Sequence, residues 1–188
     1  MLLENITRLP LAVHAAASVA AIGYFEWIKG ALDRSYAASN HPVDYATGQT
    51  SFDGGVIKGY YAQMEAAGTL DVYVTTQLID FGFILGMMCI ALFVCTLIAR
   101  LARQGSFARK AGLFAGVSIL AGALCDAIEN GISFIMLADP AGFADWLALP
   151  YSAFASVKFA LITLGMLLVL VSLVTAIAGR LIKRPAIG

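Results

Sequence analysis

Four long, almost uninterrupted apolar segments limit the folds that this chain of 188 residues can adopt. A helix needs about 20 apolar residues to cross the hydrocarbon core of a bilayer. The segments that reach this length are approximately 9–28, 76–99, 111–137 and 153–178. Only 13% of the residues are charged, which is typical of an integral membrane protein rather than a soluble one. We therefore predict an all-α integral membrane four-helix bundle in which residues 1–188 form a single domain.

The distribution of basic residues predicts how the bundle is oriented. The segment between the second and third spans and the C-terminal end carry basic residues without an acid: Arg100, Arg103, Arg109, Lys110, Arg180, Lys183 and Arg184. Acids outnumber bases in the long first loop, residues 32–75, and basic residues collect on the cytoplasmic side of membranes. We therefore expect a protein of the bacterial inner membrane with both termini in the cytoplasm. Acidic and basic residues balance at 12 each, which gives no indication of a nucleic-acid partner.

The long first loop is predicted to be partly helical. Residues 56–67 have helical character and stop at Gly68, which suits a helix C-terminus. Thr69, followed by Asp71, is typical of the start of the next helix. The stretches Asn40-His-Pro and Asp53-Gly-Gly are predicted to be turns. We expect this loop to form a small cap over the outer end of the bundle.

The acidic and lysine residues in the four spans fall at similar depths. With a rise of about 1.5 Å per residue, all of them lie in the outer half of the bilayer. They are Glu26, Asp80, Asp126, Glu129 and Lys158. On the third span, residues recur at steps of four, four, three and four, which places them on one face of a helix: Ser118, Gly122, Asp126, Glu129 and Ser133. The sequence therefore predicts a polar cavity between the helices.

The residue types in this cavity suggest acid–base chemistry. Four carboxyl groups share one lysine, and a neutral acid beside an ionised one suits general acid–base catalysis. We predict Asp126, Glu129 and Lys158 as catalytic residues, with Lys158 paired to one of the two acids. The predicted ligand-binding residues are Asp80, Asn130, Glu26 and Ser133.

No metal or cofactor is expected from the sequence. Bis-histidine haem needs two histidines at membrane depth, and only His14 qualifies because His41 lies in the outer loop. A di-iron bundle usually contains Glu-x-x-His, whereas this chain has Asp126-x-x-Glu129. Metal-independent isomerisation, cyclisation or ring opening of a lipophilic molecule fits two carboxyl groups. The ligand classes that we consider are isoprenoids, lipids and quinones.

Two other functions stay open at this point. Intramembrane charges can also serve only to fix helix packing, as in a non-catalytic accessory subunit of a larger membrane complex. Such a cluster would be fully paired and would have no cavity. Proton-coupled transport would need polar residues as far as the cytoplasmic face, but below Asp126 the third span offers only Ser118. Besides the bilayer, the partners that stay open are a second copy of the chain and a membrane complex.

Several of these residues also carry a resemblance. The pattern comprises Asp-x-x-Glu-Asn from Asp126 to Asn130, Tyr73 and Asp80 at the start of the second span, Lys158, and the helix-like stretch 61–68. It resembles a group of small bacterial four-transmembrane-helix proteins of uncharacterised function, over approximately residues 56–170. The resemblance implies a four-helix fold and draws attention to Asp80, the Asp126–Asn130 motif and Lys158. It implies no activity, and Phe83-Ile-Leu stands where that group would have a proline.

Overall fold

The computed structural model describes residues 2–181 of the chain, which form helices and no strand. Four helical segments are long and apolar enough to cross a membrane: Leu11–Ala38, Leu70–Leu101, Phe107–Leu137 and Asp145–Arg180. They confirm the predicted all-helical class with four candidate spans. The segments run further than predicted, so that only residues 39–69 separate the first two. Lys183 and Arg184, which contributed to the predicted orientation, lie outside the described residues.

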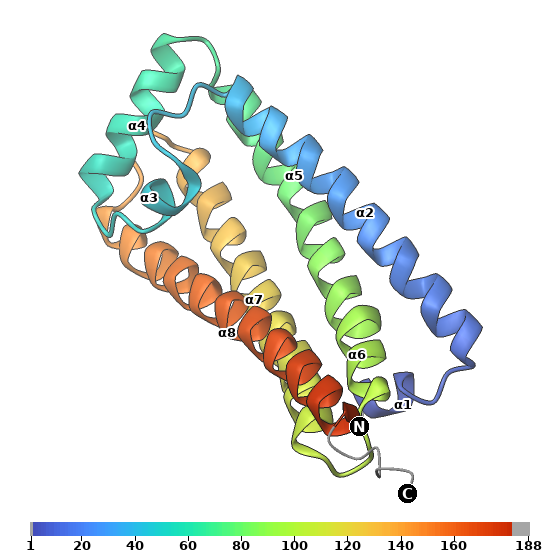
Figure 1. Cartoon of the computed structure of the whole chain (residues 1–188). Coiled ribbons are helices and arrows are strands. Elements are labelled where there is room, and N and C mark those ends of the chain that lie inside the picture. The colour runs from blue at the N-terminus through green and yellow to red at the C-terminus, as the bar shows by residue number, and fades with distance from the viewer. Residues whose placement is uncertain (1, 182–188) are drawn as a thin grey trace, which may run out of the picture.

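The long helices pack side by side in chain order (Figure 1). Helix α2 (Leu11–Ala38) contacts α5 (Leu70–Cys89), which contacts α7 (Phe107–Leu137), which contacts α8 (Ala148–Leu181) along most of its length. Helices α2 and α8 lie at opposite edges of this row and have few contacts with each other, and the side between them is called the open side below. The short α1 (Leu2–Ile6) lies at the end of the bundle where α8 finishes.

Glycines allow the close packing of neighbouring helices. A Cβ atom on Gly82 would lie 2.8 Å from the Cδ1 atom of Ile28 on α2, and one on Gly165 would lie 2.5 Å from the Cγ1 atom of Ile119 on α7. Both distances are too short for ordinary contact. The absence of side chains at Gly82 and Gly165 therefore lets neighbouring helices approach closely.

A cap covers the end of the bundle opposite α1 (Figure 1). It contains α3 (Tyr45–Gln49), α4 (Gly54–Ala66) and the short η2 (Asp145–Leu147). Ile57, Tyr61 and Met64 of α4 are buried against the ends of α5, α7 and α8. The cap therefore shares an apolar core with the bundle instead of hanging from it as a loose loop.

The predicted helix of the loop is confirmed, but one predicted turn is wrong. Helix α4 ends at Ala66, and Gly68, just beyond this end, adopts a positive φ of 67°. Asp53-Gly-Gly is a helix start, because the Asp53 Oδ1 atom accepts hydrogen bonds from the backbone amides of Gly55 (2.8 Å) and Val56 (3.1 Å). Asp-Gly is common in turns, and the same aspartate can cap a helix when the next residues are helical.

The second span is interrupted by a π-helical segment, η1 (Ile90–Cys95), between α5 and α6 (Thr96–Leu101). A π-helical turn changes the local backbone hydrogen bonding. The Phe93 carbonyl oxygen there lies 3.0 Å from His14 Nε2 and accepts a 3.1 Å hydrogen bond from Ser18 Oγ. His14 is fully buried and also lies 3.0 Å from Thr96 Oγ1. It is therefore a hydrogen-bonded structural residue that joins α2 to the second span.

His41 lies at the base of the cap among aromatic rings. Its ring centroid is 5.2 Å from those of Tyr36 and Tyr60 and 5.3 Å from that of Tyr73. Its Nδ1 atom lies 2.9 Å from the Val43 carbonyl oxygen. Burial lowers the pKa of His41 in spite of this hydrogen bond, so the folded state favours the neutral ring.

Acid is expected to loosen the cap through this histidine. A lowered folded-state pKa means that the stabilisation is complete above the ordinary value of about 6.5 and is lost as the pH falls below it. Hydrogen-exchange protection of the α3 amides, next to His41, should decrease from about pH 6.5 downward. In a His41→Gln variant the protection should not change over the same range. Constant protection in the wild-type protein would contradict this prediction.

Candidate functional site

Lys158 of α8 lies at the centre of a buried polar cluster. Its Nζ atom donates hydrogen bonds to Asp126 Oδ1 at 2.9 Å, to Gln49 Oε1 at 3.0 Å and to Glu129 Oε2. Lys158 is only 4% exposed. Lys158 was predicted to pair with one of the two acids. In the structure its ammonium group contacts both carboxylates and also the Gln49 side chain from the cap.

The local sequence explains how these groups meet. Asp126 and Glu129 are three residues apart on α7 and therefore share a face. Gly122 lies one turn before Asp126, and a Cβ atom there would lie 3.0 Å from Ile162 Cγ1 and 3.4 Å from the Lys158 carbonyl oxygen. The absence of a side chain at Gly122 lets α8 come close to α7, so that Lys158 reaches both acids.

A second group of polar residues joins α5 to α7. Asn130 Nδ2 donates a 2.7 Å hydrogen bond to Asp80 Oδ2, and Gln77 Nε2 donates a 2.5 Å hydrogen bond to Ser133 Oγ. All four side chains are buried. The structure thus brings Asp80 and Asn130 beside the lysine cluster. Ser133 lies one turn nearer the cap and is held by Gln77.

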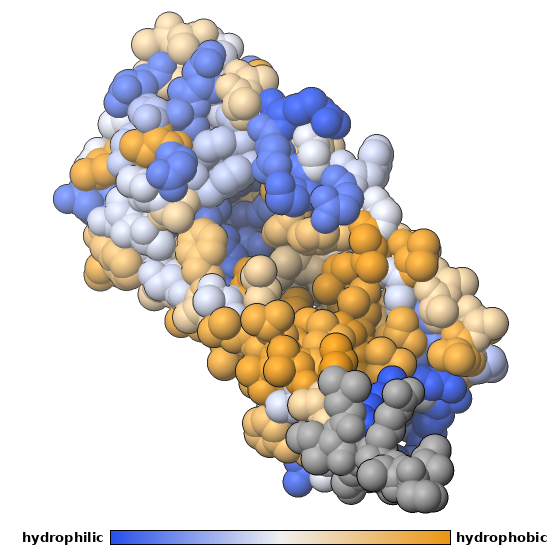
Figure 2. All heavy atoms as spheres, in the orientation of Figure 1, coloured by the Kyte–Doolittle hydropathy of each residue, from blue (hydrophilic) through white to orange (hydrophobic). Residues whose placement is uncertain are grey.

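A cavity of about 560 Å³ extends from this cluster toward the open side of the bundle. Its walls are mainly apolar side chains from all four long helices: Ile22, Phe25, Phe83, Met87, Ile90, Ile119, Phe159, Ile162 and Met166. The polar end of the cavity is formed by Asp80, Asp126, Lys158 and Gln49. Figure 2 shows the hollow beneath the cap, with hydrophilic atoms inside it and an apolar surface along its border. The volume lies within the range of small-molecule sites, about 300–1,000 Å³.

Asp80 and Asp126 line the polar end of the cavity, and each has one carboxyl oxygen without a protein partner among the described residues. Asp80 is 7% exposed and Asp126 is 2% exposed, and both line the cavity. Each uses one oxygen for the contact to Asn130 or Lys158, and the structure gives the other oxygen no hydrogen bond to any residue from 2 to 181. The polar end of the cavity therefore has two carboxyl oxygens that are not used by any described residue.

Not every predicted site residue lines the cavity. Glu26 borders it from α2 but is exposed, so it belongs to the rim and not to the buried cluster. Glu129 and Asn130 lie behind the surface of the cavity and contact Lys158 and Asp80, which line it. Ser133 does not line the cavity either, and its partner Gln77 is not a lining residue. Glu129 Oε1 and Asn130 Oδ1 are buried there without a donor among the described side chains.

The rim of the cavity is polar where α2 meets the cap. Lys29 and Asp33 form a 2.7 Å ion pair on α2, with each side chain about half exposed. Tyr45 of α3 donates a 3.2 Å hydrogen bond to the Leu32 carbonyl oxygen, and burial raises the pKa of its hydroxyl group. The hydroxyl group therefore stays a donor and fixes α3 over the cavity.

Gln49 and Gln77 are site residues that were not predicted from the sequence. Gln77 is three residues before Asp80, on the same face of α5, so helical spacing alone could have indicated it. Gln49 lies more than 100 residues from Lys158 in the chain, and no spacing relates it to the cluster.

Neither a metal-binding group among the described residues nor a similar protein identifies the site. Among residues 2–181, no group of three or more His, Cys, Asp or Glu side chains is placed to hold a metal ion. Comparisons of the chain with protein-family models, with curated proteins and with solved structures find no match.

Proposed function

We propose that this protein binds a lipophilic molecule with one hydrogen-bond-donating polar group inside the membrane. The observation that carries the proposal is the cavity of about 560 Å³, with apolar walls and two free carboxylate oxygens at its end. Apolar walls suit a hydrocarbon body, because they pack against it without leaving polar groups unpaired. The free oxygens of Asp80 and Asp126 favour a hydroxyl or amino group, because they can only accept hydrogen bonds when ionised.

The charges of the site narrow the ligand class further. The buried cluster has three carboxyl groups, on Asp80, Asp126 and Glu129, and one ammonium group, on Lys158. A ligand with a carboxylate or phosphate group would add a like charge where water is scarce, which is unfavourable. Long-chain or isoprenoid alcohols and amines meet both requirements.

The proposed location is the outer leaflet of the bacterial inner membrane. The basic residues Arg100, Arg103, Arg109 and Lys110 lie at the end of the bundle opposite the cap. Positive residues prefer the cytoplasmic side, so this end, with α1, is assigned to the cytoplasm. The cap and the cavity then lie toward the outside. Ligand enters from the lipid phase through the open side between α2 and α8.

Asp126 is the residue assigned to proton transfer with a bound ligand. It is the carboxyl group that both faces the cavity and contacts Lys158. Glu129 contacts the same ammonium group from behind and so acts as a positioning residue. A site of this kind can give a proton to a ligand or remove one. Deuterium incorporation from D₂O into a membrane lipid extract, in wild-type protein but not in Asp126→Asn, would be expected of acid–base turnover.

The two alternatives have less support. An accessory subunit with a purely structural cluster would have no reason for free acid oxygens at a cavity. Transport of protons would require a polar route toward the end that carries α1. Ser118 instead donates a 2.7 Å hydrogen bond to the Leu161 carbonyl oxygen. An apolar cluster between the second span and α7 is formed by Met87, Ala91, Ala115 and Ile119.

Three probes with the same hydrocarbon chain test the proposed polar preference. Farnesylamine and farnesol can donate a hydrogen bond, whereas farnesyl methyl ether cannot. We expect the first two to bind the purified protein at least about tenfold more tightly than the ether, since a hydrogen bond to a charged group contributes about 1.5–3 kcal/mol. Equal affinity of all three probes would contradict the proposal.

A matched pair of variants tests the proposed entry route. Met166 lines the cavity and is 65% exposed, whereas its neighbour Leu167 is 56% exposed and does not line it. Met166→Trp is expected to weaken binding of all three probes about tenfold by filling the opening. Leu167→Trp should leave binding unchanged. Equal effects of the two substitutions would show that the probes bind elsewhere.

A further inference from the structure

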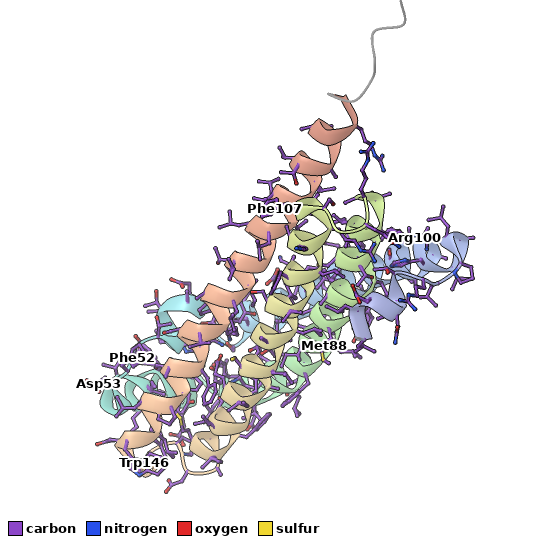
Figure 3. The ribbon with its side chains drawn as sticks, turned by 90° about the horizontal axis from the view of Figure 1, so that it is seen from below. Phe52, Asp53, Met88, Arg100, Phe107 and Trp146 are labelled. Atoms are coloured by element: carbon purple, nitrogen blue, oxygen red, sulfur yellow. The ribbon has the colours of Figure 1, made fainter. Side chains whose placement is uncertain are left out.

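A second cavity, of about 390 Å³, lies at the opposite end of the bundle from the cap. It is formed by α1, the turn that follows it, the end of α6 and the start of α7. Figure 3 places Arg100 and Phe107 toward this end and Phe52, Asp53 and Trp146 toward the other. The cavity is therefore far from the carboxylate site and has no part in it.

Three arginines and one acid line this second cavity. The arginines are Arg8, Arg100 and Arg109, and the acid is Glu4. None of the three guanidinium groups forms an ion pair with any acid in residues 2–181. The lining thus carries a surplus of two positive charges, which an anion would neutralise.

Two of the arginines are held in place by neutral partners. Arg100 Nη1 donates a 2.5 Å hydrogen bond to the Leu9 carbonyl oxygen, and Arg109 Nη2 donates a 2.9 Å hydrogen bond to Thr7 Oγ1. Each guanidinium group has five N–H donors, so most of its donors stay free. Fixing the side chains in advance lowers the entropy cost of binding a ligand.

The start of α7 adds to the positive potential. This helix of 31 residues begins at Phe107, and the cavity is also lined by Gln104 and Gly105, just before that start. The first backbone amides of a helix have no partner within the helix and favour anions. Ser106 Oγ accepts a hydrogen bond from the Arg109 amide, and the residue of this first turn that lines the cavity is Arg109 itself. Guanidinium groups and a helix start together suit a phosphate group, whose oxygens accept several hydrogen bonds at once.

We propose that this second cavity binds a phosphate group, carried by the headgroup of an anionic phospholipid in the adjacent leaflet. Two apolar side chains at the same end of the bundle are exposed, as is typical of a surface that faces lipid: Leu2 is 64% exposed and Phe107 is 66% exposed. The cavity thus lies where lipid chains and headgroups meet. A soluble phosphate compound has the same chemistry, and the experiment separates the two sources.

The experiment compares lipid retention with binding of the free anion. The full-length protein is placed in nanodiscs of equal parts phosphatidylglycerol and phosphatidylcholine, and native mass spectrometry counts the lipids that it keeps. In a parallel arm, inorganic phosphate is titrated into lipid-free protein in detergent by calorimetry. We expect the wild-type protein to keep phosphatidylglycerol at least about tenfold over phosphatidylcholine. This preference should weaken as the salt concentration rises.

Arginine variants locate the binding. Arg8→Gln is the main variant, because the Arg8 side chain makes no hydrogen bond with any other described residue and its loss should leave the fold intact. The double variant Arg100→Gln/Arg109→Gln should lose the preference completely, with thermal unfolding as the check on its fold. Arg103→Gln is the matched control: it removes the same charge from the same end of the bundle, but Arg103 does not line the cavity.

Each outcome decides the proposal. A phosphatidylglycerol preference that Arg8→Gln reduces and Arg103→Gln keeps supports the lipid headgroup. Binding of inorganic phosphate without a lipid preference overturns the lipid source and leaves a site for a soluble phosphate compound. Absence of both, or an equal loss in Arg8→Gln and Arg103→Gln, overturns the site itself.

Discussion

Replacing Lys158 by methionine is expected to lower the free energy of unfolding by about 3–5 kcal/mol, the cost of leaving buried charges without their partner. Lys158 donates to Asp126, Glu129 and Gln49, and all of these contacts are lost together. Methionine keeps a similar length and apolar stem, so the change tests the charge rather than the volume. Unfolding in mixed detergent and SDS micelles measures the difference.

Two further variants make this prediction specific. Lys29→Met removes a lysine from an ion pair that is about half exposed, and little change is expected because water and salt screen such pairs. Adding Glu129→Gln to Lys158→Met should recover part of the lost stability, since an amide needs no counter-charge. A Lys158→Met protein as stable as the wild type would contradict the importance of the bridge.

The double variant Asp80→Asn/Asp126→Asn is expected to bind farnesylamine at least about a hundredfold more weakly than the wild-type protein. Each carboxylate offers a charge-assisted hydrogen bond of about 1.5–3 kcal/mol, and the two together account for this factor. Asparagine has nearly the same shape as aspartate, so the cavity keeps its walls. Fluorescence competition or native mass spectrometry gives the affinities.

Two controls, a probe without a donor and a variant at the rim, test whether this loss of affinity comes from the two carboxylates. Farnesyl methyl ether should bind the double variant and the wild-type protein alike, because it depends on the apolar walls only. Asp33→Asn removes an acid from the rim, where Asp33 is about half exposed and pairs with Lys29, and it should change farnesylamine affinity little. Unchanged farnesylamine affinity in the double variant would refute the assigned role of the two acids.

The sequence was sufficient to predict which long helices form and that Asp126, Glu129 and Lys158 lie close together. Apolar length predicts the spans, and helical spacing places Asp126 and Glu129 on one face of α7. Counting residues from the outer surface places Asp80 and Lys158 at the same level. Both predictions succeed because a regular helix converts position in the chain into height and direction. The resemblance to small four-helix membrane proteins stays a prediction.

Other features depend on contacts that periodicity does not encode. Gln49 reaches Lys158 only because the cap folds over the bundle, and Glu129 faces away from the cavity because Lys158 of α8 takes up its carboxylate. The π-helical turn near Phe93 has no signal in residue spacing, and neither do the contacts of its Phe93 carbonyl oxygen with His14 and Ser18. Packing, and not local preference, decides these details.

The open side between α2 and α8 has a consequence for selectivity. A ligand tail longer than the cavity can extend past Met166 into the surrounding lipid without a steric penalty. The protein would then distinguish compounds by their headgroups and tolerate many chain lengths. If the proposed ligand binds from the leaflet, the quantity that sets occupancy is its mole fraction there, and exchange proceeds by diffusion in two dimensions. Affinities should accordingly be expressed per membrane lipid and not per volume of buffer.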